Sequence, residues 1–166
     1  PTVVTDKSHK SCGQSRFGCW VCTVVTEDKS MSGLIENGQE WLRPLLDFRN
    51  KLQAERNDPK NRFDYRRDGS DALNGLGQLS DAYRAKLLKR LLKAQKDIQV
   101  HFPEMTLITY QELVAIQVIW HREFIFDFNV SMIYNRIYNA GMTMEEIQER
   151  TQREHDLLKD VCKDNP

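Results

Sequence analysis

Residues 80–98 read SDAYRAKLLKRLLKAQKDI, and this stretch decides the class of fold. Ser80 is a residue type that caps helix N-termini, and apolar side chains follow it at helical spacing. They are Tyr83, Leu87, Leu91 and Ile98. A second face carries only cationic side chains, at Lys86, Lys89, Arg90, Lys93 and Lys96. The two faces predict an amphipathic helix with one buried side and one basic side.

Two more helices are expected on the N-terminal side of this stretch. Residues 30–37 predict a short helix, and Gly38 is suited to the left-handed position that follows a helix end. Residues 39–56 predict a longer helix, in which Pro44 lies in the first turn or kinks the chain. The apolar stripe of this second helix consists of Trp41, Leu45, Phe48 and Leu52.

Further helices are expected on the C-terminal side. Thr109 and Glu112 form a capping-box pattern, which opens a strongly apolar helix over residues 110–126. A shorter helix over residues 130–139 is closed by Gly141.

Thr143 and Glu146 form a second capping-box pattern, which opens an acidic last helix. Strand-like alternation never extends beyond a few residues. The sequence therefore predicts an irregular all-α domain of about five or six helices with an N-terminal Cys-rich loop segment. We place the Cys-rich segment at residues 1–27 and the helical part at residues 28–166, which together make one domain.

Charged side chains are distributed unevenly, although 24 Lys and Arg balance 24 Asp and Glu. Residues 43–96 carry a net charge of +7, residues 97–166 carry −6 and residues 1–42 carry −1. Such a division indicates either a surface for nucleic acid or another acidic partner, or two faces of one domain that attract each other. Apolar stretches stay well below the roughly 18–20 residues of a membrane span, which excludes a transmembrane protein.

Residues 57–79 hold one Pro and three Gly among many charges and predict a long loop or lid. Loops of about 20 residues are uncommon and often functional. The basic residues of this loop and of the following helix are candidates to contact a DNA backbone, and Tyr65 could stack on a base. These candidates are Arg62, Arg66, Arg67, Lys86, Lys89, Arg90, Lys93 and Lys96. The alternative is a solvated surface that docks onto an acidic partner or the acidic tail.

Three of the four cysteines form a C-x6-C-x2-C pattern, with Cys12, Cys19 and Cys22. A Cys-x-x-Cys pair lets two thiolates reach one metal ion or iron–sulfur cluster from a tight turn, and a Gly-containing loop brings the third. The clustering does not resemble the disulfide framework of a secreted domain. A redox-active disulfide and unpaired structural thiols are the alternatives to a cluster or metal site.

The residues around these cysteines suit an anionic centre. Arg16 would offset the negative charge of thiolates, while Phe17 and Trp20 would shield a cluster from water. The alternative for both aromatic residues is packing on the helical core. His9 is a nearer candidate for a zinc ligand than Cys162, which we interpret as a lone thiol near a helix end.

The string SRFGCWVCTVV at residues 15–25 is the most specific feature of the chain. Further strings accompany it, namely RRDGS at 66–70, LGQLS at 76–80, LLKRLLKAQ at 87–95 and LITYQELVAIQVIWHREF at 107–124. Together they resemble the DndC family, the sulfurtransferases of bacterial Dnd DNA phosphorothioation systems within the phosphoadenosine-phosphosulfate-reductase-like superfamily. The resemblance extends over most of the chain.

This resemblance implies that Cys12, Cys19 and Cys22 are ligands of a [4Fe-4S] cluster. It implies a fourth ligand upstream of Pro1, and a chain that is the C-terminal region of a longer protein. The family's nucleotide-binding half, with its phosphate loop, is absent from these residues. ATP therefore belongs to the missing half, and no catalytic residue is assigned in this fragment.

The preferred hypothesis is thus the iron–sulfur region of a sulfurtransferase that helps incorporate sulfur into the DNA backbone and is inactive without its missing half. The implied partners are DNA, a cysteine desulfurase as sulfur donor and other Dnd subunits, in the bacterial cytoplasm. The alternative is a non-enzymatic helical interaction module with a structural zinc site, which would use its basic stripe to dock a partner.

Overall fold

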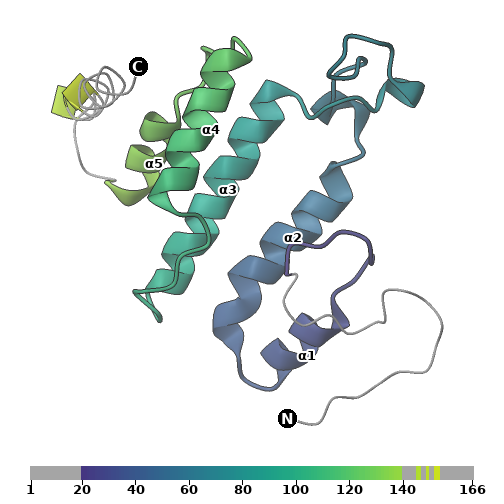
Figure 1. The fold of residues 1–166 in the computed structure, drawn as a ribbon. Helices are drawn as coiled ribbons and strands as arrows, with labels where there is room; N and C mark the ends of the chain where they lie inside the picture. Colours follow the sequence, from purple (N-terminus) through teal and green to yellow (C-terminus); the bar gives the residue numbers. More distant parts are fainter. Residues whose placement is uncertain (1–19, 140–144, 147–148, 150–151, 154–166) are drawn as a thin grey trace. The chain divides into compact units, whose positions relative to one another are not determined.

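The computed structural model describes residues 20–139, 145–146, 149 and 152–153, and these residues are mostly helical (Figure 1). Its α-helices are α1 (Lys29–Glu36), α2 (Arg43–Glu55), α3 (Asp81–Gln99), α4 (Tyr110–Arg122) and α5 (Val130–Tyr138). Three short 3-10 helices accompany them, at Glu40–Leu42 (η1), Pro59–Asn61 (η2) and Leu73–Gly75 (η3). Among the described residues there is no β-strand, so the predicted all-α class and helix number are confirmed.

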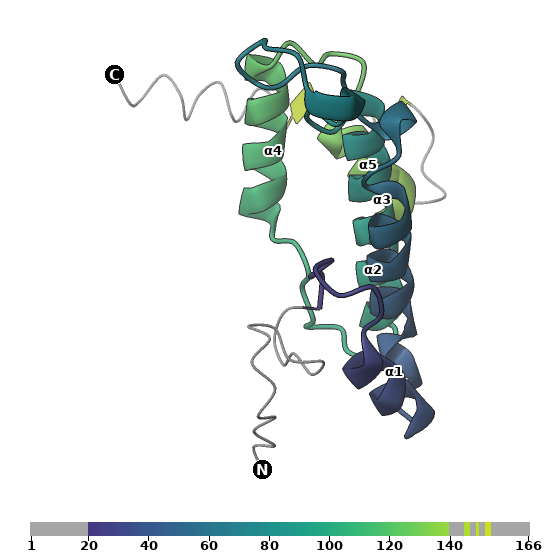
Figure 2. The same cartoon turned by 90° about the vertical axis from the view of Figure 1, so that its right-hand side faces the viewer.

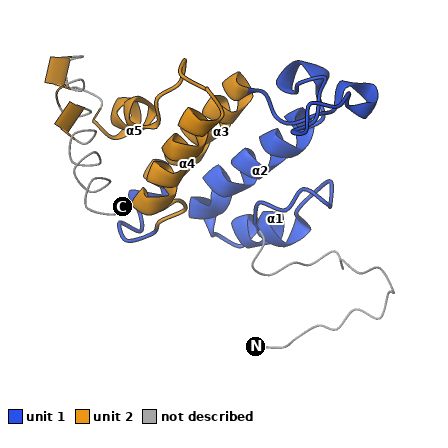
Figure 3. Ribbon diagram, turned by 45° about the horizontal axis from the view of Figure 1, so that its top comes forward, with its two compact units in different colours: residues 1–80, 97–105 blue, residues 81–96, 106–166 orange. Residues whose placement is uncertain are grey.

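The chain forms two compact units, which Figure 3 distinguishes by colour. Unit 1 contains residues 1–80 and 97–105, and unit 2 contains residues 81–96 and 106–166. Most of the predicted Cys-rich segment lies outside the described residues, so the predicted domain division at residue 27 stays a prediction.

Unit 2 is built around an apolar core shared by α3, α4 and α5. The buried members are Ala85, Leu88, Leu92, Ile108, Leu113, Trp120, Ile125, Val130 and Ile137. Helices α3 and α4 run antiparallel. The Arg84–Glu123 ion pair joins the start of α3 to the end of α4. Burial of this apolar surface is the main source of stability for the three helices.

A buried glutamine connects the three elements of this core. The Gln95 side-chain oxygen accepts hydrogen bonds from the backbone N–H groups of Leu107 and Ile108, at 2.7 and 3.0 Å. Its amide nitrogen donates to the Tyr138 hydroxyl at 2.8 Å. Because these groups are largely removed from water, losing this one side chain would leave several polar atoms without partners.

Helix α4 begins as predicted and ends earlier than predicted. At its start the Thr109 hydroxyl accepts from the Glu112 N–H, and the Glu112 carboxylate accepts from the Thr109 N–H, which confirms the capping box. The helix ends at Arg122 rather than at Phe126, since Phe124 takes a left-handed φ of +59°. The Ile125 N–H then donates to the Trp120 carbonyl at 2.8 Å, which is the Schellman bond.

The early end of α4 has a tertiary cause. A phenylalanine in the left-handed region is unfavourable, by about 1 kcal/mol or more. The turn places Ile125 in the buried core of unit 2, and burial of that side chain offsets the backbone strain.

In unit 1, α1 packs against η1 and α2 (Figure 2). Gly38 has a φ of +93° after the end of α1, as its position in the sequence predicted. The expected helix over residues 39–56 is divided, because Pro44 lies in the first turn of α2 and the preceding residues form the separate 3-10 helix η1. Leu45 and Phe48 of the predicted stripe are buried.

The loop over residues 57–79 is held in place by its own backbone. Antiparallel bridges join Arg62 to Leu79 and Tyr65 to Asp71. Gly77 is buried where the two sides of the loop meet, and its N–H donates to the Phe63 carbonyl at 2.9 Å. A Cβ atom at Gly77 would lie 2.0 Å from the Tyr65 carbonyl oxygen, so only glycine fits.

We expect Gly77→Ala to lower the free energy of unfolding by about 2–3 kcal/mol, because the new methyl group must displace backbone rather than a side chain. Gly33→Ala is the matched control, since a Cβ atom there meets nothing within 4 Å inside α1. The control should gain about 0.5–1 kcal/mol from helix propensity. Urea denaturation followed by circular dichroism measures both values. Equal stability of the two variants would contradict the close approach of the Gly77 and Tyr65 backbones.

Candidate functional site

Most of the predicted cluster ligands lie outside the described residues. Cys12, Cys19, Arg16 and Phe17 belong to that part of the chain, as do His9 and Cys162. Cys22 and Trp20 are described, and both are half-buried. Within the described residues no three His, Cys, Asp or Glu side chains come together as a metal site. The predicted metal ligand set therefore stays a prediction, and the surroundings of Cys22 provide the geometry.

The chain that follows the Cys-x-x-Cys pair is held by Arg49 of α2. The Arg49 side chain is fully buried. Its Nε donates to the Cys22 carbonyl at 3.1 Å, its Nη1 to the Thr26 carbonyl at 2.7 Å, and its Nη2 to the Val25 carbonyl. One guanidinium therefore fixes three carbonyl groups within five residues of chain.

Two further contacts fasten the same segment to α2, beside which it runs in Figures 1 and 2. Arg56, two helical turns after Arg49, donates from Nη1 to the Thr23 hydroxyl. The Trp20 ring lies 5.5 Å from the Phe48 ring, centroid to centroid, in a tilted arrangement. Trp20 therefore packs on the helical part of unit 1, as one of its two predicted roles requires.

The electrostatics around Arg49 favour an anion. Its side-chain acceptors among the described residues are the three carbonyl oxygens and the Asn50 side-chain oxygen at 3.1 Å, none of them a carboxylate. Removing a cation from water without an anionic partner is costly, although charge-assisted hydrogen bonds reduce the cost. A thiolate centre next to Cys22 would experience the uncompensated positive charge.

Sequence reasoning did not select Arg49, although a signal was present. Arg49 lies four residues after Leu45 and three before Leu52, so it falls within the apolar stripe of α2. A charged residue at a buried position of an amphipathic helix indicates a specific partner. The pattern does not reveal that the partner is backbone from 23 to 27 residues earlier in the chain.

The predicted DNA-contacting residues of the loop have different environments. Arg62 points inward, where its guanidinium donates to the carbonyls of Arg56 and Gly77. Arg66 and Arg67 are exposed at a tight turn, in which the Arg66 N–H donates to the Ser70 carbonyl at 2.7 Å. The Asp68 carboxylate accepts from the Ser70 hydroxyl and N–H, and these bonds lower its pKa.

The basic face of α3 is exposed as the spacing predicted. Lys86, Lys89, Lys93 and Lys96 are exposed and Arg90 is half-buried. The Lys96 ammonium donates to the Ile137 carbonyl at 2.6 Å, and the Lys86 ammonium lies 5.8 Å from the centre of the Tyr83 ring. Arg66 and Arg67 belong to unit 1 and these lysines to unit 2, so we describe two separate basic groups.

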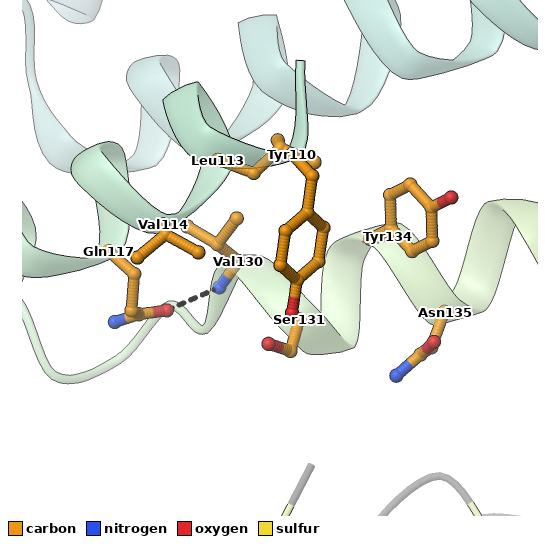
Figure 4. A pocket seen from close by; sticks show the side chains of 8 residues that line it. All are labelled: Tyr110, Leu113, Val114, Gln117, Val130, Ser131, Tyr134 and Asn135. Atoms are coloured by element: carbon orange, nitrogen blue, oxygen red, sulfur yellow. Dashed lines mark hydrogen bonds between the residues drawn. The ribbon is translucent and has the colours of Figure 1, made fainter. Parts of the chain in front are cut away.

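A small pocket lies between α4 and α5 in unit 2 (Figure 4). Its lining residues are Tyr110, Leu113, Val114, Gln117, Val130, Ser131, Tyr134 and Asn135. Gln117 connects its two walls by accepting from the Val130 N–H at 2.7 Å. The pocket volume of about 50 Å³ is far below the roughly 300–1,000 Å³ of typical ligand sites, so the pocket does not accommodate a nucleotide.

The Asn135 side chain lines this pocket, and its buried amide nitrogen has no hydrogen-bond acceptor within the part of the chain that the structure describes. Asn135 is 3% exposed, and its side-chain oxygen accepts from the Asn139 amide at 2.7 Å. The unsatisfied donor costs stability, because it has given up water without gaining a partner.

Comparisons with protein-family models, curated proteins and solved structures found no match. The functional argument therefore rests on the residues and their geometry. Within the part of the chain that the structure describes, no helix combines the length and apolar character needed to cross a membrane.

Replacing each of the two buried amide side chains of unit 2, Gln95 and Asn135, by leucine should change the free energy of unfolding by different amounts. We expect Gln95→Leu to lower the free energy of unfolding by about 3 kcal/mol, because two backbone N–H groups and the Tyr138 hydroxyl lose their partner. Asn135→Leu removes an amide nitrogen that has no acceptor among the described residues, together with the oxygen that accepts from the Asn139 amide, so we expect a smaller loss of about 1 kcal/mol. Thermal and urea unfolding of both variants give the comparison, and a larger loss at Asn135 would contradict the assignment of its amide.

Proposed function

We propose that this chain is the iron–sulfur region of a sulfurtransferase that helps incorporate sulfur into the DNA backbone. The observation that carries the proposal is the C-x6-C-x2-C pattern within SRFGCWVCTVV, the string that resembles the DndC family, followed directly by a backbone segment fixed on a buried arginine. Enzymatic activity would require the nucleotide-binding half, in a bacterial cytoplasm that keeps thiols reduced.

The residues near Cys22 fit a thiolate-bound [4Fe-4S] cluster in two respects. Cysteine thiolates are the usual protein ligands of such clusters, and Cys12, Cys19 and Cys22 supply three. Among the described residues the buried Arg49 charge has no carboxylate partner, and a centre with several thiolates bound at Cys22 would supply negative charge on that side. When bound, the cluster would hold or relay sulfur, pass electrons or stabilise the Cys segment.

The chain's own residues have narrower roles. Arg49 holds the backbone at Cys22, Arg56 binds the Thr23 hydroxyl, and the Trp20 ring packs on Phe48. The exposed lysines of α3 and the Arg66–Arg67 turn offer positive charge to DNA phosphates. A cysteine desulfurase and other Dnd subunits complete the set of proposed partners.

Metal analysis under anaerobic conditions tests the cluster directly. We expect the chain, extended upstream to include the fourth ligand, to bind iron and acid-labile sulfide and to be brown, because thiolate-bound iron absorbs visible light. Cys22→Ser should lose most of the iron and sulfide, since one of the local ligands is gone. Cys162→Ser is the matched control and should retain both.

The alternative function predicts a different composition. Zinc without sulfide, in a colourless protein that loses zinc on Cys22→Ser, would contradict the cluster and favour the helical interaction module with a structural zinc site. Iron and sulfide retained in Cys22→Ser would contradict the assignment of this ligand.

The lysine face of α3 provides a second test of the DNA proposal. Lys89 and Lys93 are exposed, and within the described residues neither side chain makes a hydrogen bond or an ion pair. If both contact phosphates, Lys89→Gln with Lys93→Gln reduces the salt dependence of duplex binding, d log K/d log [salt], by about two. Fluorescence anisotropy at several salt concentrations measures this slope.

Lys51→Gln is the control for this experiment, because Lys51 is exposed on α2 and lies outside the basic face of α3. The control should leave the slope of the parent chain unchanged. A double variant that binds DNA with the parent slope would contradict phosphate contacts by α3 and leave docking of an acidic protein as the role of this face.

A further inference from the structure

We propose that Arg49 is a positioning residue for the metal centre: by holding the backbone at Cys22 it restrains how the Cys22 thiolate is presented. The inference rests on the proposed function in one respect, since it takes Cys22 as a metal ligand. It adds a residue from a distant helix to a site that the cysteine pattern alone had defined.

The geometry of the guanidinium accounts for the positioning role. Its planar fork presents donors in fixed directions, and here they reach the carbonyls of Cys22, Val25 and Thr26. The chain must bend between residues 22 and 26 for these carbonyls to converge on one group. Holding the Cys22 carbonyl restrains the backbone at Cys22, and therefore the direction in which its side chain leaves the chain.

A lysine at the same position would keep the charge and lose the fork. Its single ammonium cannot reach three separated carbonyl groups with the spacing of Nε, Nη1 and Nη2. Arg49→Lys therefore separates the positioning role from the simple presence of a cation. Groups that orient metal ligands from outside the ligand set typically affect metal affinity by about 10–100-fold.

Thr23 offers a second, milder way to loosen the attachment of this segment to the end of α2, through Arg56 rather than Arg49. Its hydroxyl accepts from Arg56, and it is the residue directly after Cys22. Thr23→Val removes this acceptor with little change of shape. Thr26→Val is the matched control, because the Thr26 side chain is exposed and only its backbone carbonyl is used by Arg49.

The experiment is an anaerobic titration of the chain with Co²⁺, a probe of thiolate sites that does not depend on cluster assembly. Thiolate-to-cobalt charge-transfer bands report the sulfur ligands, and the ligand-field bands report the coordination geometry. We expect Arg49→Lys to bind Co²⁺ about 10–100-fold more weakly than the parent chain and to change the ligand-field bands at saturation. Thr23→Val should weaken binding several-fold with unchanged circular dichroism.

Arg43→Lys is the control for the arginine substitution. Arg43 is on the same helix, its side chain is 56% exposed, and it pairs with Glu40 at 2.9 Å. This control and Thr26→Val should reproduce the affinity and bands of the parent chain. A change of ligand-field bands at saturating Co²⁺ is not expected from a loss of overall stability, so the spectrum separates positioning from a purely structural role.

Two results would overturn the inference, and they are distinguishable. If the parent chain shows thiolate bands and Arg49→Lys matches it in affinity and spectrum, Arg49 does not position the site while the metal centre stands. If the parent chain shows no thiolate bands, the metal centre itself fails, and the role of Arg49 toward it fails with it.

Discussion

The buried guanidinium of Arg49 is the interaction on which the candidate site depends. Residues 20–28 contain no helix or strand before α1, so they lack the regular backbone hydrogen bonds of the described helices. Three of their carbonyls find a donor in one side chain of α2 instead. An irregular segment that carries a candidate metal ligand thus takes its shape from a helix.

If the proposed thiolate centre forms at Cys22, Arg49 is more compatible with thiolates than with carboxylates. A carboxylate paired with Arg49 would compete with the carbonyls for the donors of the fork. Thiolates placed nearby can benefit from the positive charge at longer range, since Coulomb attraction falls slowly with distance in a poorly solvated interior. The guanidinium N–H groups would stay bonded to the backbone carbonyls, while the positive charge of Arg49 would still attract thiolates bound at Cys22.

Unit 2 shows a comparable dependence on a few polar contacts within an apolar core. Gln95 ties α3 to the chain before α4 and to Tyr138 of α5, and burial raises the pKa of that tyrosine. The Arg84–Glu123 pair closes the opposite end of the α3–α4 contact. The side of α3 that faces away from this core carries the exposed lysines. Burial of the apolar side chains on one side of the helix therefore presents the basic residues on the other.

The sequence by itself determined the features that depend on neighbouring residues. The all-α class, the exposed lysines of α3, the capping box of Thr109 and Glu112 and the left-handed Gly38 follow from helical periodicity and local backbone geometry, and they are present in the structure. The buried leucines of α3 are Leu88 and Leu92, whereas the predicted Leu87 and Leu91 are half-buried. The cysteine spacing is equally local, and it remains a prediction about chemistry. Only the tertiary structure decided that Arg49 and Arg62 point inward and that α4 ends at Arg122. Long arginine side chains can reach either solvent or distant carbonyls, and burial of Ile125 outweighs the helix propensity of residues 123–126, so neither outcome is encoded in a short stretch of sequence.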